Sequence, residues 1–317
     1  MRAESERLPH RRCRILDSRM IRILGTIFAA LLGVAFGSFL NVCLSRWPEG
    51  ESVVSPRSHC RNCDHTLAWW ENIPLLSWLA LRGRCRKCST RIGWRYPLVE
   101  LAIGAVWASY TWGLLSGPWE TDSTALDVFS AVTFAAARVI FLWLLVALAV
   151  LDAENLWLPD WLTLPGIALG IAFKVLDLVL IVHQHVADDF ENERYGPYGV
   201  AVKWLLGILA AAALILLIRW LYKLIRKRDG IGLGDAKLMA LLAAWLGLPE
   251  ALLAFGLGAI LGSIAALVVL AVPGARRGAE GWAASKLPLG TFLCIGGIIS
   301  ALWGQPIIAA YLRWAGL

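Results

Sequence analysis

Long apolar segments recur along this 317-residue chain and alternate with polar loops. A helix needs about 20 apolar residues to cross the hydrocarbon core of a bilayer. The apolar segments therefore predict membrane helices over approximately 23–44, 97–115, 129–151, 160–182, 199–222, 236–248, 251–272 and 288–312. The segment 236–248 is short for a full span, and we expect it to begin inside a polar loop.

Composition agrees with a multi-pass membrane protein and excludes a soluble globule. Hydrophobic residues make up 58% of the chain, the mean hydropathy is +0.64, and 17 tryptophans suit helix ends at the membrane–water interface. The residues behind the net charge of +7 lie mainly in loops, so we expect a lipid bilayer and no nucleic acid as partner. The predicted fold is all-α, a polytopic bundle of about eight transmembrane helices with a small zinc-ribbon-like loop domain. We expect a polar tail at 1–22, a first transmembrane helix at 23–44, a cytoplasmic four-cysteine loop domain at 45–95 and a membrane-embedded domain at 96–317.

Loop charges predict the orientation of the helices. The loop 45–95, the end of the segment 199–222 and the loop 273–287 are basic, which favours the cytoplasm, whereas the loop 183–198 is acidic. A topology of eight spans with an external N-terminus places the three basic regions in the cytoplasm and the acidic loop outside. The arginine-rich tail disagrees, because this arrangement makes it external.

Two aspartates lie where apolar segments meet polar loops. Asp152 ends the segment 129–151, and Asp235 follows glycines at 230, 232 and 234. A carboxylate costs roughly 2.5–3.5 kcal/mol at the centre of a membrane helix and less near its end, so such acids are retained mostly for a function in a watered interior. The glycines let another helix or a substrate backbone approach closely. With eight spans, both acids lie at the cytoplasmic face.

Alone, the Asp235 segment is equally explained by a helix that starts with a solvent-facing acid after flexible glycines. A nucleotide-binding glycine loop is disfavoured, because no predicted strand precedes it. Together, the two acids indicate aspartic proteolysis, in which an ionised carboxylate deprotonates a water and a protonated one polarises the scissile carbonyl. The sequence does not assign these roles, because such a pair titrates as a unit. The rival hypothesis is an ion-coupled membrane transporter with a zinc-stabilised regulatory loop, but the chain lacks the internal symmetry typical of transporters.

The loop 45–95 contains two C-x-x-C motifs separated by 21 residues. Four thiolates in this pattern are typical of a zinc ribbon, in which the metal stabilises a loop that has no core of its own. Disulfides or free thiols are the alternative, but a cytoplasmic loop is kept reduced. We therefore expect a structural Zn²⁺, without an open position for catalysis, on Cys60, Cys63, Cys85 and Cys88. The other cysteines are interpreted as small apolar residues: Cys13, Cys43 and Cys294.

Charged residues also interrupt two apolar segments. Lys174 and Asp177 are spaced i,i+3, and we expect a local ion pair that faces the bundle, or a span that ends near Phe173. Arg138 has the same ambiguity.

Six motifs follow one another in order around the cysteine loop. They are Gly37-Ser38-Phe39-Leu40-Asn41-Val42 with Arg46 and Pro48; Trp70-Glu71-Asn72-Ile73-Pro74 with Ser77 and Leu79; Arg95-Tyr96-Pro97-Leu98-Val99-Glu100; Asp152 with Leu158-Pro159-Asp160; Gly232-Leu233-Gly234-Asp235 with Lys237; and Pro288 with Gly290 and Phe292. Together they resemble the type IV prepilin leader peptidases, the bifunctional prepilin peptidase/N-methyltransferases of the G-x-G-D aspartic class. The resemblance covers nearly the whole chain from Gly37.

This resemblance implies a substrate class and a second activity. The family removes short basic leaders from type IV prepilins and type II secretion pseudopilins at the cytoplasmic face of the bacterial inner membrane, cutting after a glycine. It then methylates the new N-terminus with S-adenosylmethionine. The implied catalytic pair is Asp152 and Asp235, in a peptidase domain at 96–317, and Asp160 is implied to be a helix-capping or supporting residue. We expect the methyl donor to bind at the cysteine-loop domain, with Gly83 and Arg84 as part of its site.

Two features depart from the family pattern. The acidic loop 183–198 lengthens the gap between the two aspartates, but an external loop leaves a cytoplasmic site undisturbed. Arg84 stands where the family often has a lysine, which leaves methyl transfer less determined than cleavage. The intact C-x-x-C motifs argue against the cysteine-free branch that has only the peptidase activity.

Overall fold

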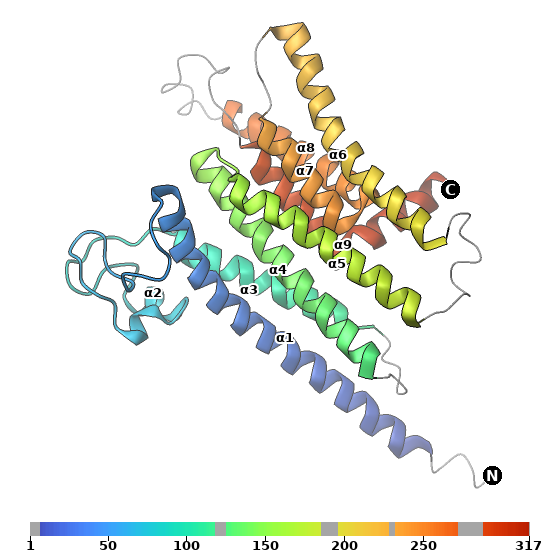
Figure 1. Ribbon diagram of the computed structural model, residues 1–317. Helices are drawn as coiled ribbons and strands as arrows, with labels where there is room; N and C mark the ends of the chain where they lie inside the picture. Colours follow the sequence, from blue (N-terminus) through green and yellow to red (C-terminus); the bar gives the residue numbers. More distant parts are fainter. Residues whose placement is uncertain (1–6, 118–124, 185–195, 228–231, 272–287, 317) are drawn as a thin grey trace. The chain divides into compact units, whose positions relative to one another are not determined.

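The structure is a computed structural model that describes residues 7–117, 125–184, 196–227, 232–271 and 288–316, and these residues are largely helical (Figure 1). This confirms the predicted all-α class. The only β pairing among the described residues consists of two isolated bridges in the cysteine loop. The elements are α1 (Arg7–Arg46), η1 (Trp47–Glu49), η2 (Trp69–Asn72), α2 (Leu76–Ala80), α3 (Arg95–Leu114), α4 (Ala125–Asn155), α5 (Asp160–Gln184), α6 (Gly196–Arg226), α7 (Leu233–Leu246), α8 (Leu248–Ala271) and α9 (Leu289–Ala315).

Each predicted apolar segment corresponds to a helix, but the prediction of eight spans is not confirmed. Six helices in the described part of the chain are long and apolar enough to cross a membrane, namely α1, α4, α5, α6, α8 and α9. The 14 residues of α7 extend about 21 Å, whereas the hydrocarbon core is about 30 Å thick. The helix α3 has 20 residues but does not qualify by composition. The chain is therefore a multi-pass membrane protein with six candidate spans.

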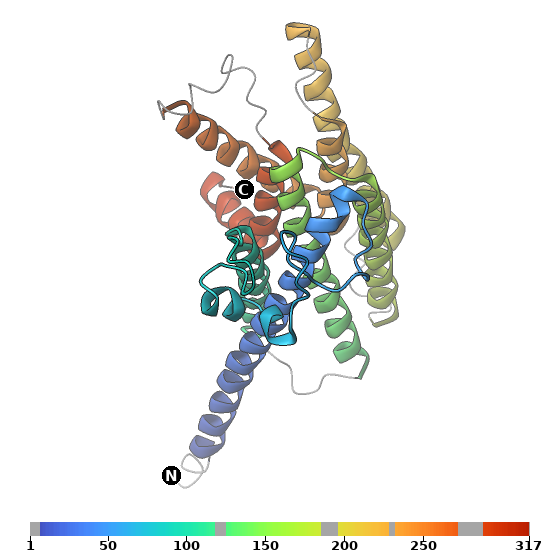
Figure 2. The ribbon, with the colours of Figure 1, turned by 90° about the vertical axis from the view of Figure 1, so that its left-hand side faces the viewer.

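The chain divides into two compact units, Met1–Asp122 and Ser123–Leu317. In the first unit, α1 packs closely against α3 because glycines lie at their contact. A Cβ at Gly37 would lie 2.6 Å from the Cα of Glu100, and one at Gly33 would lie 3.0 Å from the Cα of Gly104. The cysteine loop connects the C-terminal end of α1 to the start of α3, and it gathers at that end of the helix pair (Figure 2).

The short helix α7 forms the centre of the second unit. It contacts α5, α6, α8 and α9, and nine of its 14 residues are buried. At its C-terminal end, the indole N–H of Trp245 donates to the carbonyl of Gly166 at 2.8 Å, and the ring stacks on Phe141 with centroids 4.9 Å apart. Because protein surrounds α7, its apolar residues contact other helices, which explains why so short an apolar segment forms a helix.

Of the remaining predictions, one is confirmed, one stays a prediction and others concern residues that the structure does not describe. Lys174 Nζ lies 2.8 Å from Asp177 Oδ2 within α5, so the expected local ion pair is confirmed. The four-part domain division remains a prediction, although α3, which it assigns to the membrane-embedded domain, packs on α1 in the first unit. Other predicted features lie largely or wholly outside the described residues: the acidic loop 183–198, the loop 273–287, Gly230 and the side chain of Cys13.

Candidate active site and cysteine cluster

Asp152 lies in the last turn of α4 and is buried, with 6% of its surface exposed. Its Oδ2 accepts a hydrogen bond from the backbone N–H of Thr291 at 2.7 Å and from the Thr291 hydroxyl at 3.2 Å. The same hydroxyl lies 3.0 Å from the carbonyl oxygen of Ala149, so its single hydrogen is shared between two acceptors. Thr291 is in the first turn of α9, where the helix dipole is positive and favours a carboxylate.

Two glycines permit the close packing around this carboxyl group. A Cβ at Gly290 would lie 2.9 Å from both Cγ and Oδ2 of Asp152, and 3.0 Å from Cδ1 of Leu158. A Cβ at Gly234 would lie 3.2 Å from Cβ and Cδ1 of the same leucine. Leu158 therefore packs against both the glycine beside Asp152 and the glycine that precedes Asp235.

Asp235 is the third residue of α7, which is not among the candidate spans, and only 8% of its surface is exposed. Its Oδ2 accepts a hydrogen bond from the backbone N–H of Gly232 at 3.2 Å. Burial and, next in size, the charge of Asp152 raise the pKa of Asp235 to about 6. The buried thiol of Cys294 in α9 also interacts electrostatically with both aspartates. Helix packing thus brings two acids that lie 83 residues apart, from 152 to 235, close enough to interact electrostatically.

A second polar contact joins α5 to α7 near Asp235. Lys237 Nζ lies 2.5 Å from Asp160 Oδ1, and the two side chains are 35% and 60% exposed. Asp160 is the first residue of α5, and Lys237 follows Asp235 by two positions. The carboxylate of Asp160 is thus engaged by a lysine, and the helix-capping or supporting role implied for it stays a prediction.

The four cysteines of the loop converge, and their sulfur atoms all lie within 4.8 Å of one another. The two motifs have the same backbone geometry. Cys60 and Cys85 each donate an N–H to the carbonyl five residues later, and each accepts an N–H from the residue four positions later, all at 2.9 Å. Those last residues, Asp64 and Ser89, both have a positive φ, 52° and 56°.

The geometry of the cluster fits a tetrahedral metal. Four sulfurs bonded to zinc at about 2.3 Å lie about 3.8 Å apart, and the sulfurs of Cys60 and Cys88 are 3.7 Å apart. All six cysteines whose side chains are described are free, so the disulfide alternative is not supported. Hydrogen bonds with Thr90, first its hydroxyl and then its backbone, lower the pKa of Cys88 to about 5, whereas the pKa of Cys63 in the same cluster is raised.

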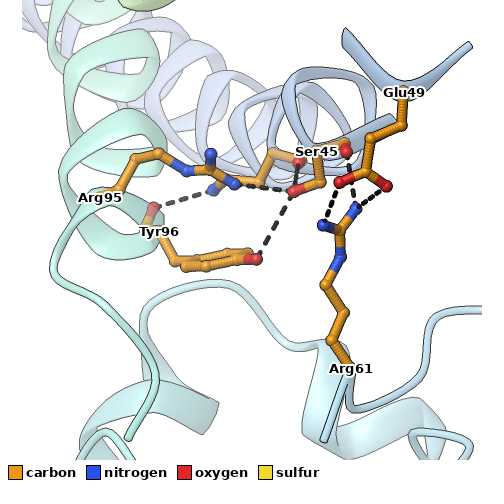
Figure 3. A network of polar contacts seen from close by, with 6 residues as sticks. Ser45, Glu49, Arg61, Arg95 and Tyr96 are labelled. Carbon is orange, nitrogen blue, oxygen red and sulfur yellow. Dashed lines mark hydrogen bonds and ion pairs between the residues drawn. The ribbon is translucent and has the colours of Figure 1, made fainter. Parts of the chain in front are cut away.

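Polar contacts fix the loop to the ends of α1 and α3 (Figure 3). Arg61, inside the first C-x-x-C motif, donates to Glu49 at 2.8 Å and to the carbonyl of Ser45 at 2.6 Å. The hydroxyl of Ser45 accepts from Arg95 at 2.7 Å and lies 3.5 Å from the hydroxyl of Tyr96. One residue of α1 therefore connects the cysteine loop with the start of α3.

Other motif residues of the first unit bind backbone groups. Arg46 is buried and donates to two loop carbonyls, those of Ser52 at 2.7 Å and Pro56 at 2.6 Å. Asn41 donates to the carbonyl of Tyr96 at 2.9 Å, joining α1 to α3. Glu100, which is also buried, accepts the N–H of Leu75 at 2.7 Å. These motif residues hold the loop and the helix pair together.

Comparison with known proteins identifies the family of the chain. Residues 139–267 match the Type IV leader peptidase family, and residues 31–114 match the Bacterial Peptidase A24 N-terminal domain. The chain is 34% identical over 266 residues to the prepilin leader peptidase/N-methyltransferase of Stutzerimonas stutzeri, which covers 84% of this chain and 78% of the relative. The chain belongs to the type IV leader peptidase family.

Other relatives carry the same name. The Pseudomonas aeruginosa protein is 34% identical over 268 residues, which cover 84% of this chain and 78% of the relative. A Burkholderia pseudomallei protein is 36% identical over 262 residues, which cover 82% and 71% of the two chains. No solved structure matches this member of the type IV leader peptidase family.

The assignment of Gly83 and Arg84 to a methyl-donor site remains a prediction. Gly83 is buried with φ +64°, and a Cβ there would lie 2.8 Å from the ring of Trp78, so the turn itself requires a glycine. Arg84 is exposed and forms a β-bridge with Arg91. The described contacts give Gly83 a structural role and leave the side chain of Arg84 accessible.

Sequence analysis missed Thr291, which contacts Asp152 from 139 residues away. It lies between Gly290 and Phe292, inside one of the motifs that carry the family resemblance. The available signal was a hydroxyl residue just after Pro288 at the start of an apolar segment, a position where helix N-termini bind acids. Nothing in the sequence indicated which acid it would meet.

Proposed function

We propose that this chain is a prepilin leader peptidase of the bacterial inner membrane. It would cleave basic leaders from type IV prepilins and type II secretion pseudopilins at the cytoplasmic face, after a glycine, and then methylate the new N-terminus. Family membership supports this substrate class, because relatives at 34% identity are named prepilin leader peptidase/N-methyltransferases. The observation that carries the proposal is the pair of buried, electrostatically coupled carboxyl groups of Asp152 and Asp235.

The proposed reaction is hydrolysis of a peptide bond by this pair. Two neighbouring carboxyls do not ionise together easily, so one of them keeps its proton to a higher pH than an isolated aspartic acid does. The carboxylate removes a proton from a water that attacks the scissile carbonyl carbon, and the carboxylic acid donates to the carbonyl oxygen. Burial strengthens both interactions, because few water molecules compete with them. Ion transport, the rival hypothesis, has no observation that favours it.

The cysteine cluster is proposed to hold one structural Zn²⁺ through Cys60, Cys63, Cys85 and Cys88. With four protein ligands, the ion would cross-link the loop and have no open position for substrate. The methyl donor, S-adenosylmethionine, is proposed to bind at the same loop domain, with Gly83 and Arg84 contributing. The exposed guanidinium of Arg84 would attract the carboxylate of the donor.

The test is incubation of the purified protein in lipid with a prepilin and a labelled methyl donor. We expect a shortened pilin and label on its new N-terminus. A prepilin with a bulky residue in place of the glycine before the cleavage site is the matched substrate control and should remain intact. If the folded, zinc-containing protein leaves the natural prepilin intact, the proposed function is wrong. Cleavage without label would contradict only the methyl transfer.

A further inference from the structure

The two aspartates of the candidate active site have different hydrogen-bond environments. Asp152 Oδ2 accepts from the N–H of Thr291 at 2.7 Å and from the Thr291 hydroxyl at 3.2 Å, both from the first turn of another helix. Asp235 Oδ2 accepts from the N–H of Gly232 at 3.2 Å, within the start of its own helix. Donors directed at a carboxylate stabilise its charged form, and the short bond to Asp152 is typical of a charged acceptor.

Among the described residues, the groups that stabilise the carboxylate of Asp152 lie on α9. In the part of the chain that the structure describes, the titratable groups whose electrostatic interaction with it is resolved are the Asp235 carboxyl on α7 and the Cys294 thiol on α9, and neither is a cation. The ammonium group of Lys237 is paired with Asp160. Both carboxyl groups lie at the positive N-terminal end of a helix, Asp152 at α9 and Asp235 at α7. What distinguishes Asp152 is the pair of donors from Thr291, where Asp235 has one longer bond.

We infer that Asp152 is the ionised general base of the pair, that Thr291 is the positioning residue that holds it, and that Asp235 is the protonated general acid. This inference rests on the proposed function. The pKa of Asp235, raised to about 6, agrees with its keeping a proton to a higher pH than an isolated aspartic acid does.

The proton movements then follow. The Asp152 carboxylate takes a proton from water, the water oxygen bonds to the scissile carbon, and Asp235 gives its proton to the carbonyl oxygen. As the carbon–nitrogen bond breaks, the proton on Asp152 passes to the leaving nitrogen. Asp235 regains a proton from a hydroxyl of the tetrahedral intermediate, which leaves a carboxylic acid, an amine and the enzyme in its starting state.

Thr291→Val tests this assignment, because it removes the hydroxyl and keeps both the shape and the backbone N–H. A hydrogen bond to a charged group is lost, so kcat should fall about tenfold. The acidic limb of kcat/KM against pH, which reports ionisation of the base, should move up by about one pH unit, and the alkaline limb should stay. Thr291→Ser should restore the wild-type profile.

Ser300→Ala is the matched control, because the Ser300 hydroxyl also lies on α9 and donates to a backbone carbonyl, that of Glu250, at 2.8 Å. It should keep both limbs in place. Movement of the alkaline limb in Thr291→Val would reverse the two roles, and no movement of either limb would make Thr291 merely structural. Both results overturn the inference. A wild-type protein that cleaves no prepilin would instead refute the proposed function.

A measurement on the wild-type protein keeps the assignment testable if Thr291→Val does not fold. Epoxides alkylate ionised carboxylates, so an active-site-directed epoxide should label Asp152, as mapped by peptide mass spectrometry. Label on Asp235 would overturn the inference.

Discussion

A methyl group added at Gly290 should displace the carboxyl group of Asp152. In Gly290→Ala, the new Cβ would lie 2.9 Å from Cγ and Oδ2 of Asp152 and 3.0 Å from Cδ1 of Leu158. Carbon atoms in contact normally lie about 3.5–4.0 Å apart. Asp152, or the start of α9, must therefore move by about 0.6–1.1 Å, the difference between these distances.

The expected loss of activity follows from this displacement. Misplacing a catalytic group by 1 Å costs on the order of 100-fold in rate, so kcat for prepilin cleavage should fall about 100-fold. Overpacking costs about 1–3 kcal/mol of folding free energy, which the replacement of a helical glycine by alanine offsets by about 0.5–1 kcal/mol. The protein should thus remain folded, with a free energy of unfolding lowered by about 2 kcal/mol or less.

Initial cleavage rates at saturating prepilin, measured by gel, test this prediction. Gly256→Ala in α8 is the matched control, because a Cβ there meets no heavy atom within 4 Å. The control should cleave at the wild-type rate. A folded Gly290→Ala protein that cleaves as fast as the control would refute the reasoning, since Asp152 would then tolerate a shift that the packing imposes.

Three further predictions concern the remaining contacts. Lys237→Gln and Asp160→Asn should each lower the free energy of unfolding by about 1 kcal/mol or less, because the pair is partly exposed; a double-mutant cycle without coupling would contradict the ion pair. Cys63→Ser should lose the zinc that elemental analysis finds at about one ion per chain, whereas Cys43→Ser should keep it; equal zinc in both would argue against the four-sulfur site. Arg46→Ala removes two charge-assisted hydrogen bonds to the loop, each worth about 1.5–3 kcal/mol, and should accelerate limited proteolysis there several-fold; an unchanged digestion rate would exclude the anchoring role.

The fold was largely predictable because apolar segments and helices follow the same physical requirement. Each predicted segment overlaps a helix along most of its length, since backbone groups in a membrane must find their partners inside the segment. The number of spans was not predictable from apolarity alone. The residues of α7 are apolar because other helices surround them, and a buried helix has the same composition as one that faces lipid.

The parts of the candidate sites that depend on short sequence motifs were predictable. The C-x-x-C spacing predicted a cluster whose four sulfurs do converge. The catalytic pair of Asp152 and Asp235 stays a prediction, although the charge of Asp152 contributes to the raised pKa of Asp235. The contact of Thr291 with Asp152 and that of Lys237 with Asp160 were not predictable. They join residues 139 and 77 positions apart, and only the packing of the helices decides which polar side chains meet.

Prepilin cleavage by Asp152→Asn, Asp235→Asn and the double variant tests the central claim most directly. If the two carboxyls act as a pair, each single variant should lose roughly 10,000-fold in kcat, and the double variant should be no worse than the singles, because residues that act as a unit are not additive. All three should remain folded in the membrane. Retained cleavage in either single variant, or losses that multiply in the double variant, would contradict the account.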